Sequence, residues 1–133
     1  MTRILIADDH EVVRSGLRVI LEAQDGWEVV AEADNGKDAV AKALDSKPDI
    51  AVIDYSLPLI NGVEATRQIR AHLPNTEILM FTIHDNETIV RELLEAGARA
   101  YVAKSEATNI RLQRWNLSSN TSRFLRAGFL STC

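Results

Sequence analysis

From Arg3 to about Ala103 the chain alternates short apolar, β-branched runs with longer segments that have helical periodicity. This alternation is typical of βα units, in which helices connect parallel strands and cover both faces of the sheet. The runs expected to be strands are Ile4–Ala7, Trp27–Ala33, Ile50–Ile53, Ile78–Thr82 and Ala100–Ala103. The pattern therefore predicts a doubly wound α/β fold built on a five-stranded parallel sheet.

Amphipathic segments lie between these runs. Apolar side chains recur at helical spacing within residues 13–21, 39–44, 63–73 and 89–94. Gly97 follows the last of these segments, where a glycine can end a helix in a left-handed turn. Four helices of ordinary length are therefore expected between the strands.

Composition places the chain among globular proteins. With 133 residues, 46% of them hydrophobic and 26% charged, it fits one compact domain. Its single cysteine, Cys133, excludes an intramolecular disulfide and favours a cytoplasmic location. The first apolar run stops at two aspartates after only four residues, so neither a signal peptide nor a membrane span is expected.

Charge is distributed unevenly along the chain. Residues 1–103 carry 10 basic and 18 acidic side chains, whereas residues 104–133 carry 5 basic and 1 acidic. Phosphate contacts need a basic surface, so the acidic body argues against nucleic-acid binding by this domain itself.

Polar side chains stand at the end of four of the expected strands. They are Asp8 and Asp9 after the first run, Asp54 after the third, Thr82 in the fourth and Lys104 after the fifth. Taken singly, each is more often a cap or a solvated residue. Because the carboxyl ends of parallel strands meet at one edge of a sheet, we expect them to share one pocket. Such a pocket suits a hard divalent cation beside a carboxylate that accepts a phosphoryl group.

The three histidines invite comparison with transition-metal sites. His10, His72 and His84 have no ligand-motif spacing, and each is expected in a loop or at an element end. We therefore expect all three to be ordinary residues.

Several short motifs together resemble one known family. They are Ile4-Leu-Ile-Ala-Asp-Asp-His10, Asp54 before Leu57-Pro58 and Gly62, Thr82-Ile-His-Asp, Gly97-Ala-Arg-Ala-Tyr101, and Lys104-Ser. In combination they resemble the receiver domain of a bacterial two-component response regulator over residues 1 to about 107. The Asp8-Asp-His-Glu-Val-Val-Arg14 segment and the Lys-Ser pair are most similar to the NarL/FixJ (LuxR-type) branch.

The resemblance implies a fold and a role for each residue. The fold is the flavodoxin-like order 2-1-3-4-5, here with an atypical last helix. The implied roles are phosphoacceptor for Asp54, magnesium or manganese ligands for Asp8, Asp9, Asp54 and the backbone carbonyl of Ser56, switch hydroxyl for Thr82, switch aromatic for Tyr101 and phosphate-pairing cation for Lys104.

The implied function is a switch driven by phosphorylation. A partner histidine kinase would phosphorylate Asp54, favouring dimerisation and control of a transcriptional output domain in a longer protein. The domain would catalyse only its own phosphorylation and dephosphorylation. Two alternatives stay open: a magnesium-dependent phosphatase with Asp54 as nucleophile, and a scaffold that binds partners without being phosphorylated.

Three features depart from the family pattern. Ile83 stands where a small residue is usual, and Ser105 replaces the commoner proline after the lysine. Residues 108–133 form a basic and polar tail that we expect to be partly helical or disordered, with a short helix from near Glu106 and disorder beyond about Ser118. No DNA-binding domain follows in this sequence, so contact with DNA would need an absent C-terminal helix-turn-helix domain. The loss of pattern suggests a truncated chain or an altered reading frame.

Overall fold

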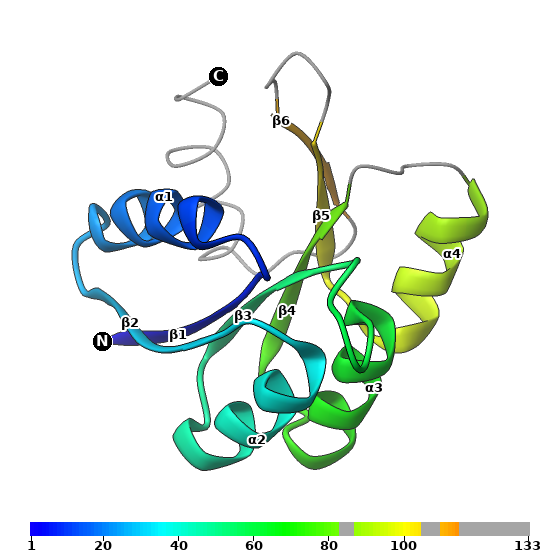
Figure 1. Cartoon of the computed structure of the whole chain (residues 1–133), viewed down its shortest axis with the longest axis horizontal. Coiled ribbons are helices and arrows are strands. Elements are labelled where there is room, and N and C mark those ends of the chain that lie inside the picture. Colours follow the sequence, from blue (N-terminus) through cyan, green and yellow to red (C-terminus); the bar gives the residue numbers. More distant parts are fainter. Residues whose placement is uncertain (83–86, 105–109, 115–133) are drawn as a thin grey trace.

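The fold is a twisted sheet covered by helices on both faces (Figure 1). The computed structural model describes residues 1–82, 87–104 and 110–114, in which the strands follow the order β2-β1-β3-β4-β5-β6. The first five strands are parallel, and β6 runs antiparallel to β5. The predicted order 2-1-3-4-5 is thus confirmed, with one strand added at the β5 edge.

The elements begin and end close to the expected positions. The strands are β1 (Thr2–Ala7), β2 (Trp27–Ala33), β3 (Ile50–Asp54), β4 (Glu77–Thr82), β5 (Ala100–Lys104) and β6 (Ile110–Arg114). The helices are α1 (Glu11–Glu22), α2 (Gly36–Ser46), α3 (Gly62–His72) and α4 (Glu87–Ala96). Within the described ranges, no helix combines the length and the apolar character that crossing a membrane requires.

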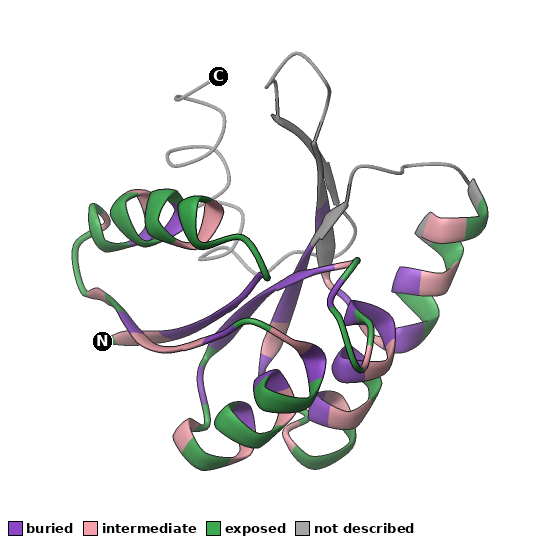
Figure 2. Ribbon diagram, viewed as in Figure 1, coloured by how far each residue is buried: buried purple, intermediate pink, exposed green. Residues whose placement is uncertain are grey.

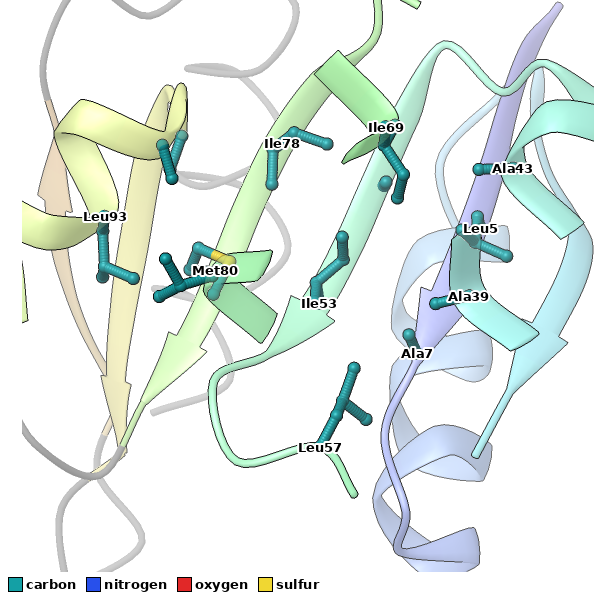
Figure 3. Close-up of a cluster of buried hydrophobic side chains, with 14 of the residues drawn as sticks. Leu5, Ala7, Ala39, Ala43, Ile53, Leu57, Ile69, Ile78, Met80 and Leu93 are labelled. Atoms are coloured by element: carbon teal, nitrogen blue, oxygen red, sulfur yellow. The ribbon is translucent and has the colours of Figure 1, made fainter. Parts of the chain in front are cut away.

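The central strands bury side chains on both faces, as the continuous apolar runs predict (Figure 2). Alternate residues point to opposite sides, so Ile4 and Ile6 of β1 pack with Leu17 and Leu21 of α1. The other face of the sheet packs against α2, α3 and α4 (Figure 3). Its buried members in the figure include Leu5, Ala7, Ala39, Ala43, Ile53, Ile69, Ile78, Met80 and Leu93.

Side chains and glycine define several helix ends. The side-chain oxygens of Asn35 and Asn61 accept hydrogen bonds from the third backbone N–H of α2 and α3, at 2.7 and 2.9 Å. Gly97 adopts a φ of 107°, and the N–H of Ala98 donates to the carbonyl of Leu93. This is a left-handed C-terminal cap, and it confirms the predicted role of Gly97.

Strand β6 is the main departure from the sequence-based expectation. We expected a short helix from near Glu106; residues 105–109 lie outside the described ranges, but Ile110–Arg114 pair antiparallel with β5. In this segment Ile110 and Leu112 alternate with polar residues, which is strand periodicity and not helical periodicity. Expectations for residues 115–133 lie outside the described part of the chain.

Candidate active site

The carboxyl ends of the parallel strands converge at one edge of the sheet. Asp54, the last residue of β3, pairs with Phe81 of β4. Thr82 follows Phe81 and pairs with Ala103 of β5, directly before Lys104. The backbone therefore places Thr82 on the strand next to that of Asp54, and Lys104 one strand further along the same edge of the sheet. Ile83 and Ser105 lie outside the described residues.

A compact cluster of titratable side chains stands at this edge. One ligand atom from each of Asp8, Asp9, His10 and Asp54 lies within 4.8 Å of all the others. Asp8 and Asp54 are buried, with 1% and 7% of their surface exposed, whereas Asp9 is 36% exposed. The structure thus brings Asp54 together with the adjacent pair Asp8 and Asp9, from which it is well separated in the sequence.

His10 also lies in this cluster, although no ligand-motif spacing in the sequence indicated a place for it. Its ring Nδ1 lies 3.2 Å from Asp8 Oδ1 and 3.1 Å from Asp9 Oδ1, and its backbone N–H donates to Asp8 Oδ1 at 2.8 Å. Ligand-motif spacing could not reveal this, because the partners are adjacent residues in one turn. The position of a histidine directly after two strand-end aspartates was the available signal.

The donor set matches a hard divalent cation. Three carboxylate groups supply oxygen ligands of the kind that Mg²⁺ and Mn²⁺ prefer, and one of them remains partly open to water. Magnesium retains several of its waters when bound to proteins, so a half-open site of this kind suits it. The residues present therefore fit the metal that the resemblance implies.

The loop after Asp54 is held close to the start of α3. The N–H of Ser56 donates to Asp54 Oδ1 at 3.3 Å, and the N–H of Gly62 donates to the carbonyl of Tyr55 at 3.0 Å. A Cβ added at Gly62 would lie 2.3 Å from the carbonyl oxygen of Asp54. Only a glycine allows the helix to approach the Asp54 backbone this closely.

Tyr101, the predicted switch aromatic, points into the core. It is 6% exposed, pairs with Met80 in the sheet and belongs to the cluster that packs beneath α2, α3 and α4. Tyr101 lies on β5, three residues before Lys104. Lys104 ends that strand, at the edge of the sheet that carries the candidate site.

Tyr55 connects the residue after Asp54 to α4. Its hydroxyl donates a hydrogen bond to Glu92 Oε1 at 3.2 Å. Burial raises the pKa of the Tyr55 phenol, and the neighbouring Glu92 carboxylate raises it further by its charge and its hydrogen bond. The neutral phenol is therefore the form that this contact stabilises.

Replacing Tyr55 with phenylalanine should lower the free energy of unfolding by about 1 kcal/mol at neutral pH, because one hydrogen bond to a carboxylate is lost. A raised pKa in the folded state means that this stabilisation is complete below pH 10 and is lost as pH rises through the folded value. Urea unfolding should therefore show the wild type losing its advantage over Tyr55→Phe above pH 10. A constant difference between the two proteins at every pH would contradict this assignment.

The sequence profile of the response regulator receiver domain matches residues 4–114, which is most of the chain. The chain belongs to this family. The match agrees with the parallel sheet and with the strand-end carboxylates. This receiver domain belongs to the LuxR-type (NarL/FixJ) branch of two-component response regulators, as its relatives indicate.

Two relatives and one complex illustrate the similarity. The receiver domain is 40% identical over 107 residues to the response regulator UvrY of Escherichia coli K12, covering 80% of this chain and 49% of UvrY. A LuxR-family response regulator of Aurantimonas sp. SI85-9A1 is 42% identical, with a TM-score of 0.75 and coverage of 79% of this chain and 75% of that one. The CheX-CheY-BeF₃-Mg²⁺ complex of Borrelia burgdorferi contains a chain that is 25% identical, with a TM-score of 0.73 and coverage of 77% and 78%.

The receiver domain spans about half the length of the curated relatives that it matches, between 43% and 49% for the first of them. Those relatives include proteins described as transcriptional regulators.

Proposed function

We propose that this receiver domain accepts a phosphoryl group on Asp54 from a partner histidine kinase. The observation that carries the proposal is the buried Asp54 carboxylate, whose oxygen lies within 4.8 Å of ligand atoms of Asp8 and Asp9. An Asp54 oxygen attacks the phosphorus of a phosphohistidine, the P–N bond breaks, and its electron pair stays on the departing imidazole. The product is an aspartyl phosphate at the edge of the sheet.

Asp8, Asp9, Asp54 and the backbone carbonyl of Ser56 would hold a magnesium ion, with manganese as an alternative. When bound, the cation offsets the negative charge of the carboxylates and of the phosphoryl oxygens. Asp54 supplies the nucleophile, and the N–H of Ser56 already holds one of its oxygens in place. The related Borrelia complex contains beryllium fluoride together with magnesium, which supports testing this pair of ligands here.

Thr82, Lys104 and Tyr101 complete the proposed switch. Thr82 ends β4, the strand beside β3, and Lys104 ends β5, the next strand along the sheet. A hydroxyl there can bond a phosphoryl oxygen, and an ammonium can pair with its charge. Phosphorylation adds about −1.5 to −2 charges, enough to draw both groups toward the phosphoryl group and to favour the buried position of the Tyr101 ring. The output surface is then the face of α4 and β5.

The proposed output is conformational and not enzymatic. The domain catalyses only its own phosphorylation and dephosphorylation, favours a homodimer when phosphorylated, and controls a DNA-binding output domain in a longer cytoplasmic protein. A phosphatase would instead turn over a phosphomonoester repeatedly. Stoichiometric labelling without turnover of such a substrate separates these two functions.

The decisive experiment combines phosphorylation with an isosteric variant. Intact mass after incubation with magnesium and acetyl phosphate should show one added phosphoryl group on the wild type and none on Asp54→Asn. Asp45→Asn is the matched control, because Asp45 is an exposed aspartate of α2 outside the acidic cluster. Equal labelling of Asp54→Asn and the wild type would refute the assignment.

A second measurement addresses the scaffold alternative. Beryllium fluoride with magnesium should shift the backbone NMR resonances of Asp54, Thr82 and Tyr101, because the mimic occupies the position of the phosphoryl group. A spectrum that stays unchanged would favour a scaffold that binds partners without phosphorylation.

A further inference from the structure

Arg14 of α1 reaches back to the strand end that carries the acidic cluster. Its guanidinium Nη1 donates to the backbone carbonyl oxygen of Asp8 at 2.6 Å. The same guanidinium pairs through Nε with Glu32 Oε1 of β2 at 3.3 Å, and only 18% of the Arg14 side chain is exposed. The planar fork therefore links three segments: the end of β1, the helix α1 and the strand β2.

The carbonyl that accepts the hydrogen bond from Arg14 belongs to the peptide group between Asp8 and Asp9. The carbonyl of Asp8 and the N–H of Asp9 are parts of one rigid peptide unit, which joins two of the proposed magnesium ligands. The preceding peptide is held as well, because the N–H of Asp8 donates to the carbonyl of Ala33 at 3.0 Å. The backbone on each side of the Asp8 Cα is thus anchored to β2, directly on one side and through Arg14 and Glu32 on the other.

We propose that Arg14 is a positioning residue, which sets the orientation of the Asp8–Asp9 peptide and thereby preorganises the magnesium site. The inference rests on the proposed function, since it assigns Arg14 a role in the magnesium site at which Asp54 would be phosphorylated. Without this contact the Asp8–Asp9 peptide can rotate, and the Asp9 carboxylate leaves its place in the cluster for part of the time. Groups that orient metal ligands from outside the coordination sphere commonly affect metal affinity by about 10- to 100-fold.

Arg18 offers a matched control on the same helix. Its Nη1 donates to Glu32 Oε2 at 2.6 Å, and its Nε lies 3.5 Å from Glu22 Oε1. Arg18 therefore shares Glu32 with Arg14 and carries the same charge, but its guanidinium pairs with carboxylates of β2 and α1. Arg18→Gln removes an ion pair with Glu32 while leaving the bond between Arg14 and Asp8.

The experiment measures magnesium affinity at a temperature well below unfolding, by NMR titration with magnesium chloride alone. Arg14→Gln should raise the dissociation constant about tenfold, whereas Arg18→Gln should change it less than about twofold. Arg14→Lys should fall between wild type and Arg14→Gln, because one ammonium cannot bridge the carbonyl and Glu32 as a fork does. In the metal-free protein, Arg14→Gln should also broaden the amide resonance of Asp9.

The salt dependence separates orientation from charge. Removing a cation near the site would by itself strengthen magnesium binding, and this effect would disappear at high salt. The proposed weakening should persist at both low and high salt. Unchanged affinity of Arg14→Gln, equal weakening by Arg14→Gln and Arg18→Gln, or tighter binding at low salt would each overturn the inference. Wild-type protein that binds no magnesium would instead refute the proposed function.

Discussion

Gly62→Ala is expected to lower the free energy of unfolding by about 3 kcal/mol, because no small movement can accommodate the new methyl group. The added Cβ would lie 2.3 Å from the carbonyl oxygen of Asp54 and 2.9 Å from the Cα of Tyr55. Both contacts are with backbone atoms, so the start of α3 must move away from β3. Chemical denaturation of the purified variant measures the loss.

Gly16→Ala provides the control for this prediction. Gly16 lies on the exposed side of α1, and a Cβ at that position would meet nothing within 4 Å. Alanine should therefore stabilise the domain by about 0.5–1 kcal/mol, because it loses less backbone freedom on folding than glycine. If Gly62→Ala proved as stable as Gly16→Ala, the close approach of α3 to Asp54 would be wrong.

Asp9→Asn is expected to have opposite effects on the metal-free and the magnesium-bound protein. Three carboxylates within 4.8 Å repel one another, so neutralising the most exposed of them should stabilise the metal-free domain by about 1 kcal/mol. The same change removes a proposed magnesium ligand. Saturating magnesium should then raise the melting temperature of the wild type and leave that of Asp9→Asn nearly unchanged.

The test is thermal unfolding of the wild type and Asp9→Asn, each with and without magnesium. Asp9→Asn should have the higher melting temperature without magnesium, and only the wild type should gain from adding it. Asp45→Asn is again the control, since it removes an exposed carboxylate outside the cluster and should alter neither quantity by much. A magnesium-induced rise of equal size in Asp9→Asn and the wild type would show that Asp9 is not part of the cation site.

The strands were predictable because their signal is local. The continuous apolar runs of β1 and β3 reflect burial on both faces, and the structure extends them by only one or two residues. The end of α4 was equally readable, since Gly97 stands where a left-handed turn is needed. The order of the first five strands followed from the family resemblance and agrees with the observed pairing.

The structure departs from expectation, or adds to it, where the sequence signal is weak or long-range. Ile110–Arg114 has the alternation of a strand, but a segment of five residues gives only a weak signal. The need for a helix to cover the sheet therefore favoured a helix there. The contact of the His10 ring with Asp8 and Asp9 was not evident either, because the spacing of the histidines matches no metal motif. The pairing of Arg14 with Glu32 had no sign in the sequence, because Glu32 is 18 residues away in strand β2.

The amino-acid sequence by itself determined where the strands lie and which polar residues end them, because apolar periodicity acts between near neighbours. Only the tertiary structure decided that Asp8, Asp9 and Asp54 come within 4.8 Å, that His10 joins them and that Arg14 anchors the peptide between two of them. These distances depend on strand register, loop path and side-chain rotamers together. Such quantities are set by packing across the whole domain, and no short stretch of sequence contains them.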